Sequence, residues 1–176
     1  VILSMVPYSR RHNEYCRSLR ESFQLNEVDA AETLLDAEKL WYKHRTYGEI
    51  YREKRHHRHP SRYFGANFHS LLSNGHFEVR FHSATLIPSK ILEWVNLHTL
   101  ILDACARGAM DYQFLKEAQA TFRIDEKAEM LFNRVGLQES SKQYFRSRQR
   151  KFGDKENKEG EEQAGPAPEQ LTRIRR

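Results

Sequence analysis

The sequence has few cysteines and no long hydrophobic run. Its 176 residues include only two cysteines, Cys16 and Cys105, which are far apart and have no Cys or His at metal-ligand spacing. Neither a disulfide framework nor a zinc knuckle is predicted, and a reducing, cytoplasmic setting is the expectation. No stretch approaches the roughly 20 apolar residues of a transmembrane helix. Residues 1–20 also lack the apolar segment of a signal peptide.

Charge is concentrated in one segment of the chain. Hydrophobic residues make up 39% and charged residues 30%, with a mean hydropathy of −0.82, which is typical of a folded core with solvated segments. Residues 43–62 contain seven Lys or Arg and two Glu, an excess that equals the whole net charge of +5. Four of the nine histidines lie there, and Pro60 stands near its end. This composition indicates an exposed basic loop.

Helical periodicity is present on both sides of this loop. A helix at residues 87–107, entered through Pro88 and ended by Gly108, is expected to be mostly buried. Further helices are predicted at residues 13–23, 26–45, 111–122, 125–135 and 139–150. Polar and charged residues dominate from Gly153 onward, so we expect residues 1–150 to form one domain and residues 151–176 a disordered tail.

The segment at residues 62–83 has the pattern of a β-hairpin. Asn74-Gly75 lies between aromatic-rich runs, which predicts a two-residue turn that pairs Asn67 with His82. In that register one face carries Phe77, Val79 and Phe81 and packs on the helix at residues 87–107. The other face groups polar side chains, namely Asn67, His69, Glu78, Arg80 and His82.

The polar face admits two interpretations. A carboxylate such as Glu78 is suited to a divalent cation, and the forked donors of Arg80 are suited to a phosphate group. An ordinary solvated pair between Glu78 and Arg80 accounts for the same pattern.

Several ordered blocks resemble the amidoligase family. The central block, Glu78-Val79-Arg80-Phe81-His82-Ser83-Ala84-Thr85, has the family's Glu-x-Arg-x-His-x-x-Thr pattern. An arginine-tyrosine and asparagine block at residues 62–71 precedes it, and an Ile-x-x-Trp block at residues 90–95 follows. Residues 5–16 are similar to the family's proline, Ser-Arg and Asn-x-Tyr-Cys segment. The resemblance covers about residues 1–107.

This resemblance implies a fold and an activity. The fold would be α+β, a curved antiparallel sheet covered by helices, similar to glutamine synthetase and glutamate-cysteine ligase. The activity would be ATP-dependent amide formation, in which a carboxylate is converted to an acyl phosphate and an amine then displaces phosphate. The implied cofactors are ATP and Mg²⁺, and the partners are a carboxylate and an amine, either peptides or small molecules.

The same resemblance assigns roles to individual residues. Glu78 matches a metal ligand and Arg80 a phosphate-contacting, catalytic arginine. Arg62 and Asn67 match positions near the nucleotide, and His82 is a further catalytic candidate. Family members also have an upstream Gly-x-Glu-x-Glu metal site and a His-x-His segment, and neither precedes Met5. We therefore expect an N-terminally truncated fragment, inactive by itself, of a longer ligase.

A second hypothesis is a noncatalytic binding module. The basic loop at residues 43–62 would then hold an acidic partner or nucleic acid, with Tyr47 and Tyr51 stacking on bases. A zinc site at His56-His57-Arg58-His59 is less favoured than a solvated loop, since adjacent histidines do not easily converge on one ion. Cys16 is interpreted as a packed thiol in preference to a nucleophile.

Overall fold

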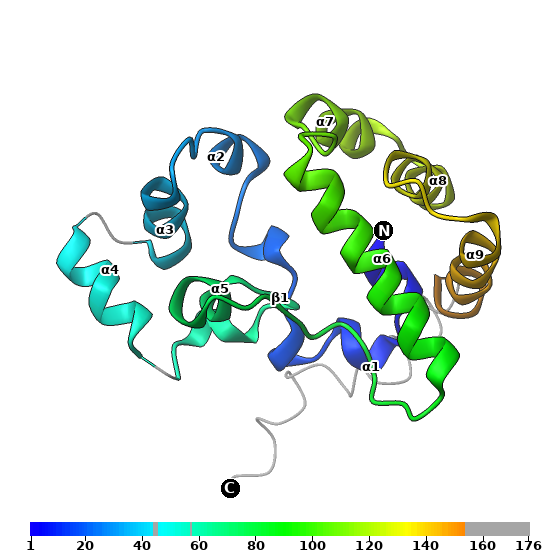
Figure 1. The fold of residues 1–176 in the computed structure, drawn as a ribbon, viewed down its shortest axis with the longest axis horizontal. Helices are drawn as coiled ribbons and strands as arrows, with labels where there is room; N and C mark the ends of the chain where they lie inside the picture. Colours follow the sequence, from blue (N-terminus) through cyan, green and yellow to red (C-terminus); the bar gives the residue numbers. More distant parts are fainter. Residues whose placement is uncertain (44–45, 57, 154–176) are drawn as a thin grey trace, which may run out of the picture.

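The computed structural model describes residues 1–43, 46–56 and 58–153, and these residues are mostly helical. Helices α2 to α5 lie on one side of the molecule and helices α6 to α9 on the other. The N-terminal segment starts beneath α6 and crosses to α2 (Figure 1). Each side has its own hydrophobic core.

The N-terminal segment contains only short elements. They are η1 (Ile2–Met5), α1 (Tyr8–Arg11), η2 (Glu14–Cys16) and η3 (Leu19–Glu21). The prediction of one helix at residues 13–23 is therefore wrong. Arg17 has extended backbone there, since its N–H donates to the Tyr63 carbonyl at 2.9 Å and its carbonyl accepts from Gly65 N–H at 2.8 Å. These bonds to a distant segment replace those that a helix would make.

Two helices replace the single helix predicted at residues 26–45. They are α2 (Leu25–Asp29) and α3 (Leu34–Tyr42). The second begins at Thr33, whose hydroxyl accepts from Asp36 N–H in a capping box. The cap starts a new helix at that point and separates it from α2.

The basic segment at residues 43–62 is not simply a loop. It contains α4 (Tyr47–Lys54) and η4 (Pro60–Tyr63) among its described residues. A second capping box, formed by Thr46 and Glu49, begins α4. Ile50 is fully buried against Trp41 and Phe64, so this segment helps to form a core.

A helix stands where the hairpin turn was predicted. β1 (Ala66–Asn67) and β2 (Glu78–Val79) do pair antiparallel, but α5 (Phe68–Asn74) connects them. The register pairs Asn67 with Glu78, so the predicted pairing of Asn67 with His82 is wrong. Gly75, with φ of 77°, ends α5 in the left-handed conformation, which glycine adopts without strain. Asn74-Gly75 is thus a helix end.

The C-terminal half follows the predicted helices closely. They are α6 (Pro88–Ala106), α7 (Tyr112–Ala120), α8 (Ile124–Arg134) and α9 (Glu139–Gly153). One face of α6 packs into the larger core through Trp94, Leu97 and Ala104, together with Phe132 and Phe145. The expectation that α6 is mostly buried is wrong for its other face, where large side chains are exposed: Ile91, Leu92, Val95 and Leu102.

The α+β expectation holds in a reduced form. The described residues contain helices and one two-stranded antiparallel sheet, and no curved, glutamine synthetase-like sheet is seen among them. None of their helices is long and apolar enough to cross a membrane. Residues 151–153 of the predicted tail belong to α9, and the remainder of that tail, residues 154–176, lies outside the described residues.

Candidate functional site

Four polar residues come together at the strand pair. Asn67 caps α5, its Oδ1 accepting from Ser70 N–H at 3.3 Å, and its Nδ2 donates to Glu78 Oε2 at 2.6 Å. Arg80 Nη2 lies 2.9 Å from Glu78 Oε1 and 3.0 Å from Oε2. The sequence placed Asn67, Glu78 and Arg80 on one face, and the structure brings these three together through a different register. We call Asn67, Ser70, Glu78 and Arg80 the strand-pair cluster.

The Glu78 carboxylate is held in its ionised form. Partial burial raises its pKa, but hydrogen bonds from Asn67, Arg80 and Ser70, together with the charge of Arg80, outweigh this and lower it. The Glu78 side chain is 39% exposed and that of Arg80 is 19% exposed. A charged carboxylate and a guanidinium are therefore both presented to solvent from a fixed backbone.

The backbone of Arg80 is fixed from two sides. Its N–H donates to the Gly65 carbonyl at 2.7 Å. Its carbonyl accepts a hydrogen bond from Arg10 Nη2 and another, at 3.2 Å, from the Cys16 thiol. Cys16 is fully buried, and burial raises the pKa of its thiol despite the opposing charges of Arg10 and Arg80. The interpretation of Cys16 as a packed thiol agrees with this environment.

Residue 65 must be glycine because its backbone lies very close to the Phe81 ring. A Cβ at this position would lie 1.9 Å from Cε1 of Phe81, far inside van der Waals contact. The backbone of residue 65 thus passes directly over the Phe81 ring, and Phe81 in turn packs against the larger core. This contact places Arg80, the neighbour of Phe81, beside the strand pair.

His82 does not join the strand-pair cluster. Its ring lies 3.9 Å from that of Trp94 and 5.0 Å from that of His98, between β2 and α6. Burial, followed by electrostatic interaction with His98 and by the positive charges of Arg148 and Arg10, lowers the pKa of His82 to about 3. Both ring nitrogens are buried with no hydrogen-bond partner among the described residues. His82 is therefore a neutral part of the wall between these elements.

The other predicted polar residues lie apart from the cluster. Arg62 is on η4, with its guanidinium 5.8 Å from the Tyr63 ring centre. Burial is the main cause that lowers the pKa of His69, and interactions with His59 and then Arg62 lower it further. His69, predicted on the polar face, is buried on α5 and hydrogen-bonds the Tyr42 hydroxyl at 2.9 Å. Thr85 lies in the connection between β2 and α6.

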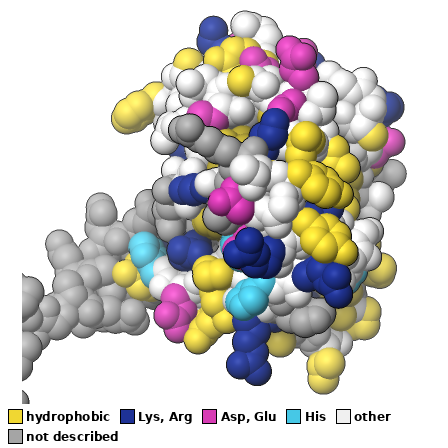
Figure 2. Space-filling view, turned by 90° about the vertical axis from the view of Figure 1, so that its left-hand side faces the viewer, with side chains coloured by type: hydrophobic (Ala, Val, Ile, Leu, Met, Phe, Trp, Pro, Cys, Tyr) yellow, Lys and Arg dark blue, Asp and Glu magenta, His cyan; other side chains and the backbone are white. Residues whose placement is uncertain are grey.

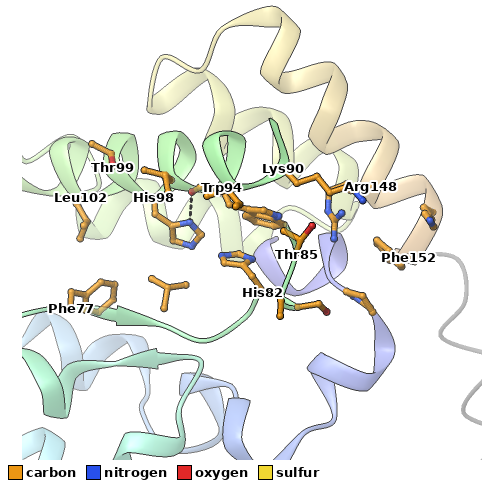
Figure 3. A pocket seen from close by; sticks show the side chains of 17 residues that line it. Phe77, His82, Thr85, Lys90, Trp94, His98, Thr99, Leu102, Arg148 and Phe152 are labelled. Atoms are coloured by element: carbon orange, nitrogen blue, oxygen red, sulfur yellow. Dashed lines mark hydrogen bonds between the residues drawn. The ribbon is translucent and has the colours of Figure 1, made fainter. Parts of the chain in front are cut away.

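A pocket of about 620 Å³ lies between β2 and α6, and sequence reasoning missed it. Phe77 and Leu102 stand at one end, Lys90, Arg148 and Phe152 at the other, and Trp94 lies between them (Figure 3). Of the predicted apolar strand face, Phe81 packs against the larger core, whereas Phe77 and Val79 line this open space. The apolar positions on the outer face of α6 were the available signal for it.

Glu78 was predicted to bind a metal ion, but the described residues around it do not supply a full set of metal ligands. No group of three or more His, Cys, Asp or Glu that could hold a metal ion is found within residues 1–43, 46–56 and 58–153. Magnesium usually has six oxygen ligands, and the strand-pair cluster has one carboxylate, already paired with Arg80. The described residues by themselves do not fit a magnesium site.

Basic side chains of the segment at residues 43–62 interact with other side chains of the protein. Lys54 Nζ contacts Glu38 at 2.6 Å, and Glu38 is only 5% exposed. The Arg55 guanidinium lies 5.5 Å from the Tyr51 ring centre and hydrogen-bonds its hydroxyl at 3.0 Å. On the face that carries α3 and α4, basic side chains are interspersed with acidic and hydrophobic ones (Figure 2).

Comparison with known proteins identifies the family. The model of a family described as "putative amidoligase enzyme" matches residues 2–102, which is more than half of the chain. The chain therefore belongs to this amidoligase family, and the resemblance inferred from the sequence is confirmed. No curated protein and no solved structure matches it. The matched region contains the whole strand-pair cluster and ends within α6.

Proposed function

We propose that this chain contributes the strand-pair cluster to an ATP-dependent carboxylate-amine ligase that acts through an acyl phosphate. Family membership supports a ligase-type enzyme. The observation that carries the finer proposal is the grouping of Asn67, Glu78 and Arg80, from two separate motif blocks, at one partly exposed place.

Arg80 is suited to binding a transferred phosphoryl group. Its guanidinium has parallel donors that match phosphate oxygens, and the positive charge stabilises the charge that develops during transfer. At rest Glu78 holds it in place, and Asn67 orients Glu78 from the other side. The backbone bonds to Gly65 and Arg10 limit how far the guanidinium can move.

The proposed reaction has two steps. A carboxylate oxygen of the first substrate attacks the γ-phosphorus of ATP, and ADP leaves. The amine nitrogen of the second substrate then attacks the acyl carbon, inorganic phosphate leaves with the bonding electron pair, and the amine loses a proton to solvent. Magnesium would accompany the ATP and would meet Glu78 only with further oxygen ligands from outside the cluster.

The test is ATP turnover that depends on a carboxylate and an amine, measured in the polypeptide translated from the complete reading frame. ATP, Mg²⁺ and panels of carboxylates would be supplied with hydroxylamine as the amine, so that an acyl phosphate is trapped as a hydroxamate. Glu78→Gln and Arg80→Met should each reduce turnover by about 100-fold or more. Asp103→Asn and Arg107→Met are matched controls, since these residues form an exposed ion pair at 2.8 Å on and just after α6.

Two results would overturn the proposal. One is turnover that survives both cluster variants, with circular dichroism showing that they are folded. The other is salt-sensitive oligonucleotide binding without any ATP turnover, lost on replacing Arg52, Lys54, Arg55 and Arg58 together, which would instead establish the binding-module hypothesis.

A further inference from the structure

The pocket between β2 and α6 has two chemically different ends. One end has the apolar side chains of Phe77 and Leu102, and further apolar side chains line the space along β2 and α6: Val79, Ile91 and Val95. The other end contains the cationic side chains of Lys90 and Arg148 (Figure 3). Lys151, which follows Arg148 on α9 and precedes Phe152, also lines the pocket. A ligand that satisfies both ends needs an apolar body and a negatively charged group.

No described carboxylate neutralises the positive charge at the cationic end. None of the residues that line the pocket is Asp or Glu. Within the part of the chain that the structure describes, no ion pair involves Lys90, Arg148 or Lys151. Three like charges around one space repel one another, and an anion placed among them removes that repulsion.

Arg148 is pre-positioned for this role. Its Nε donates to the Met5 carbonyl at 3.0 Å, and its guanidinium lies 5.4 Å from the Trp94 ring centre and 4.9 Å from that of Phe152. Among residues 1–43, 46–56 and 58–153, no hydrogen bond or ion pair engages its two terminal nitrogens, which are therefore available to another acceptor. A guanidinium held in this way loses little conformational entropy when it binds a carboxylate with two parallel hydrogen bonds.

The middle of the pocket carries no charge at neutral pH. Burial lowers the pKa of His98 and, with nearby positive charges, that of His82 to about 3, so both rings are neutral. His98 Nδ1 is engaged with the Trp94 carbonyl at 2.8 Å. The two imidazole rings are tilted by 35° and 38° from the Trp94 ring, and together the three rings form an uncharged aromatic wall that an apolar chain can contact.

We propose that this pocket binds a monocarboxylate with an extended apolar chain. The carboxylate lies among Lys90, Arg148 and Lys151, and the chain runs past Trp94 toward Phe77 and Leu102. A nucleotide fits the apolar end less well, because few polar groups there could bond a base or a ribose. Arg148 and Lys151 lie on α9, outside the region that matches the family model.

This site is independent of the strand-pair cluster. Val79 lines the pocket, whereas its neighbours Glu78 and Arg80 do not, as expected of alternating side chains on a strand. The proposal therefore does not rest on ligase activity, and its test is a binding measurement that needs no ATP turnover.

The experiment is calorimetric titration of the protein with octanoate and decanoate. We expect one equivalent to bind, with affinity rising by up to about 15-fold between the two ligands as two methylene groups are buried. In a Trp41→Phe background Trp94 is the single remaining tryptophan, and its fluorescence should change with the same saturation curve. Lys90→Gln and Lys151→Gln should each weaken decanoate binding by about tenfold.

The controls separate this proposal from nonspecific apolar binding. Lys116→Gln, a change on α7 outside the pocket, should leave decanoate binding unchanged. Decanol should bind much more weakly than decanoate. Equal binding of decanol, several equivalents of decanoate, no binding, or displacement of decanoate by ATP or inorganic phosphate at similar concentration would each overturn the proposal.

Discussion

Replacing Gly65 with alanine should destabilise the protein and disturb the strand-pair cluster. The new Cβ would lie 1.9 Å from Cε1 and 2.5 Å from Cδ1 and Cζ of Phe81, so the ring or the strand must move by more than 1 Å. Overpacking of this kind costs about 1–3 kcal/mol. Movement of the strand also weakens the bonds from Gly65 to Arg17 and Arg80, each worth about 0.5–1.5 kcal/mol. We expect a loss of about 2–4 kcal/mol in the free energy of unfolding.

Urea unfolding followed by tryptophan fluorescence measures this loss. For a slope of about 2 kcal/mol per molar, the midpoint should fall by about 1–2 M. Gly48→Ala is a matched control, because Gly48 lies in α4 with no atom within 4 Å of the added Cβ. Alanine favours a helix over glycine, so this change should raise stability by up to about 1 kcal/mol.

A double-mutant cycle identifies the cause. Phe81→Ala removes the ring that the new methyl group would meet, so Gly65→Ala should cost about 1 kcal/mol or less in that background. Gly65→Ala in the parent protein would refute the reasoning if its midpoint matched that of Gly48→Ala. The reasoning would also be refuted if the effects of Gly65→Ala and Phe81→Ala on the free energy of unfolding were additive.

Three further results are expected. Lys54→Met should cost about 1–3 kcal/mol of stability in urea unfolding, because Glu38 is 5% exposed and loses its partner at 2.6 Å; an unchanged midpoint contradicts this. Between pH 6.5 and about 3 the unfolded chain binds a proton at His82 that the folded chain does not, since the folded pKa is about 3. The free energy of unfolding should therefore fall as the pH decreases, by at most about 1.4 kcal/mol per pH unit, and solvent screening at the partly exposed ring makes the fall smaller. His82→Phe should reduce this pH dependence. Iodoacetamide should modify the exposed Cys105 in the native protein but the buried Cys16 only after unfolding, as mass spectrometry would show; equal rates would contradict the packing.

The C-terminal helices could be predicted from the sequence because their signals are local. Pro88 at the first turn and Gly108 just after the last one mark the limits of α6. The local sequence pattern does not predict which face of α6 packs against the rest of the protein. That depends on helices α8 and α9 and on the N-terminal segment, whose positions no local pattern specifies.

The sequence predicted that Asn67, Glu78 and Arg80 share one face, but it predicted neither Ser70 as their neighbour nor the geometry of the strand-pair cluster. Asn74-Gly75 is a strong hairpin signal, yet Phe68, Leu71 and Leu72 have the spacing of a helix, and Asn67 is a favourable cap before them. These signals prevailed and shifted the register, which separated His82 from Glu78 and Arg80. The pocket involves Arg148, far along the chain, and no local pattern reveals such a contact.

The contacts of α9 bear on where a domain boundary lies. The family match stops at residue 102, but Arg11 Nη2 bonds the Phe152 carbonyl at 2.6 Å and Gln149 Nε2 bonds Ser4 Oγ at 3.4 Å. Met5 and Val6 are buried in the same core as Phe132 and Phe145. A polypeptide truncated at residue 102 would leave these side chains open to water and favour aggregation. The shortest folding unit therefore extends through α9, well beyond the segment that matches the family model.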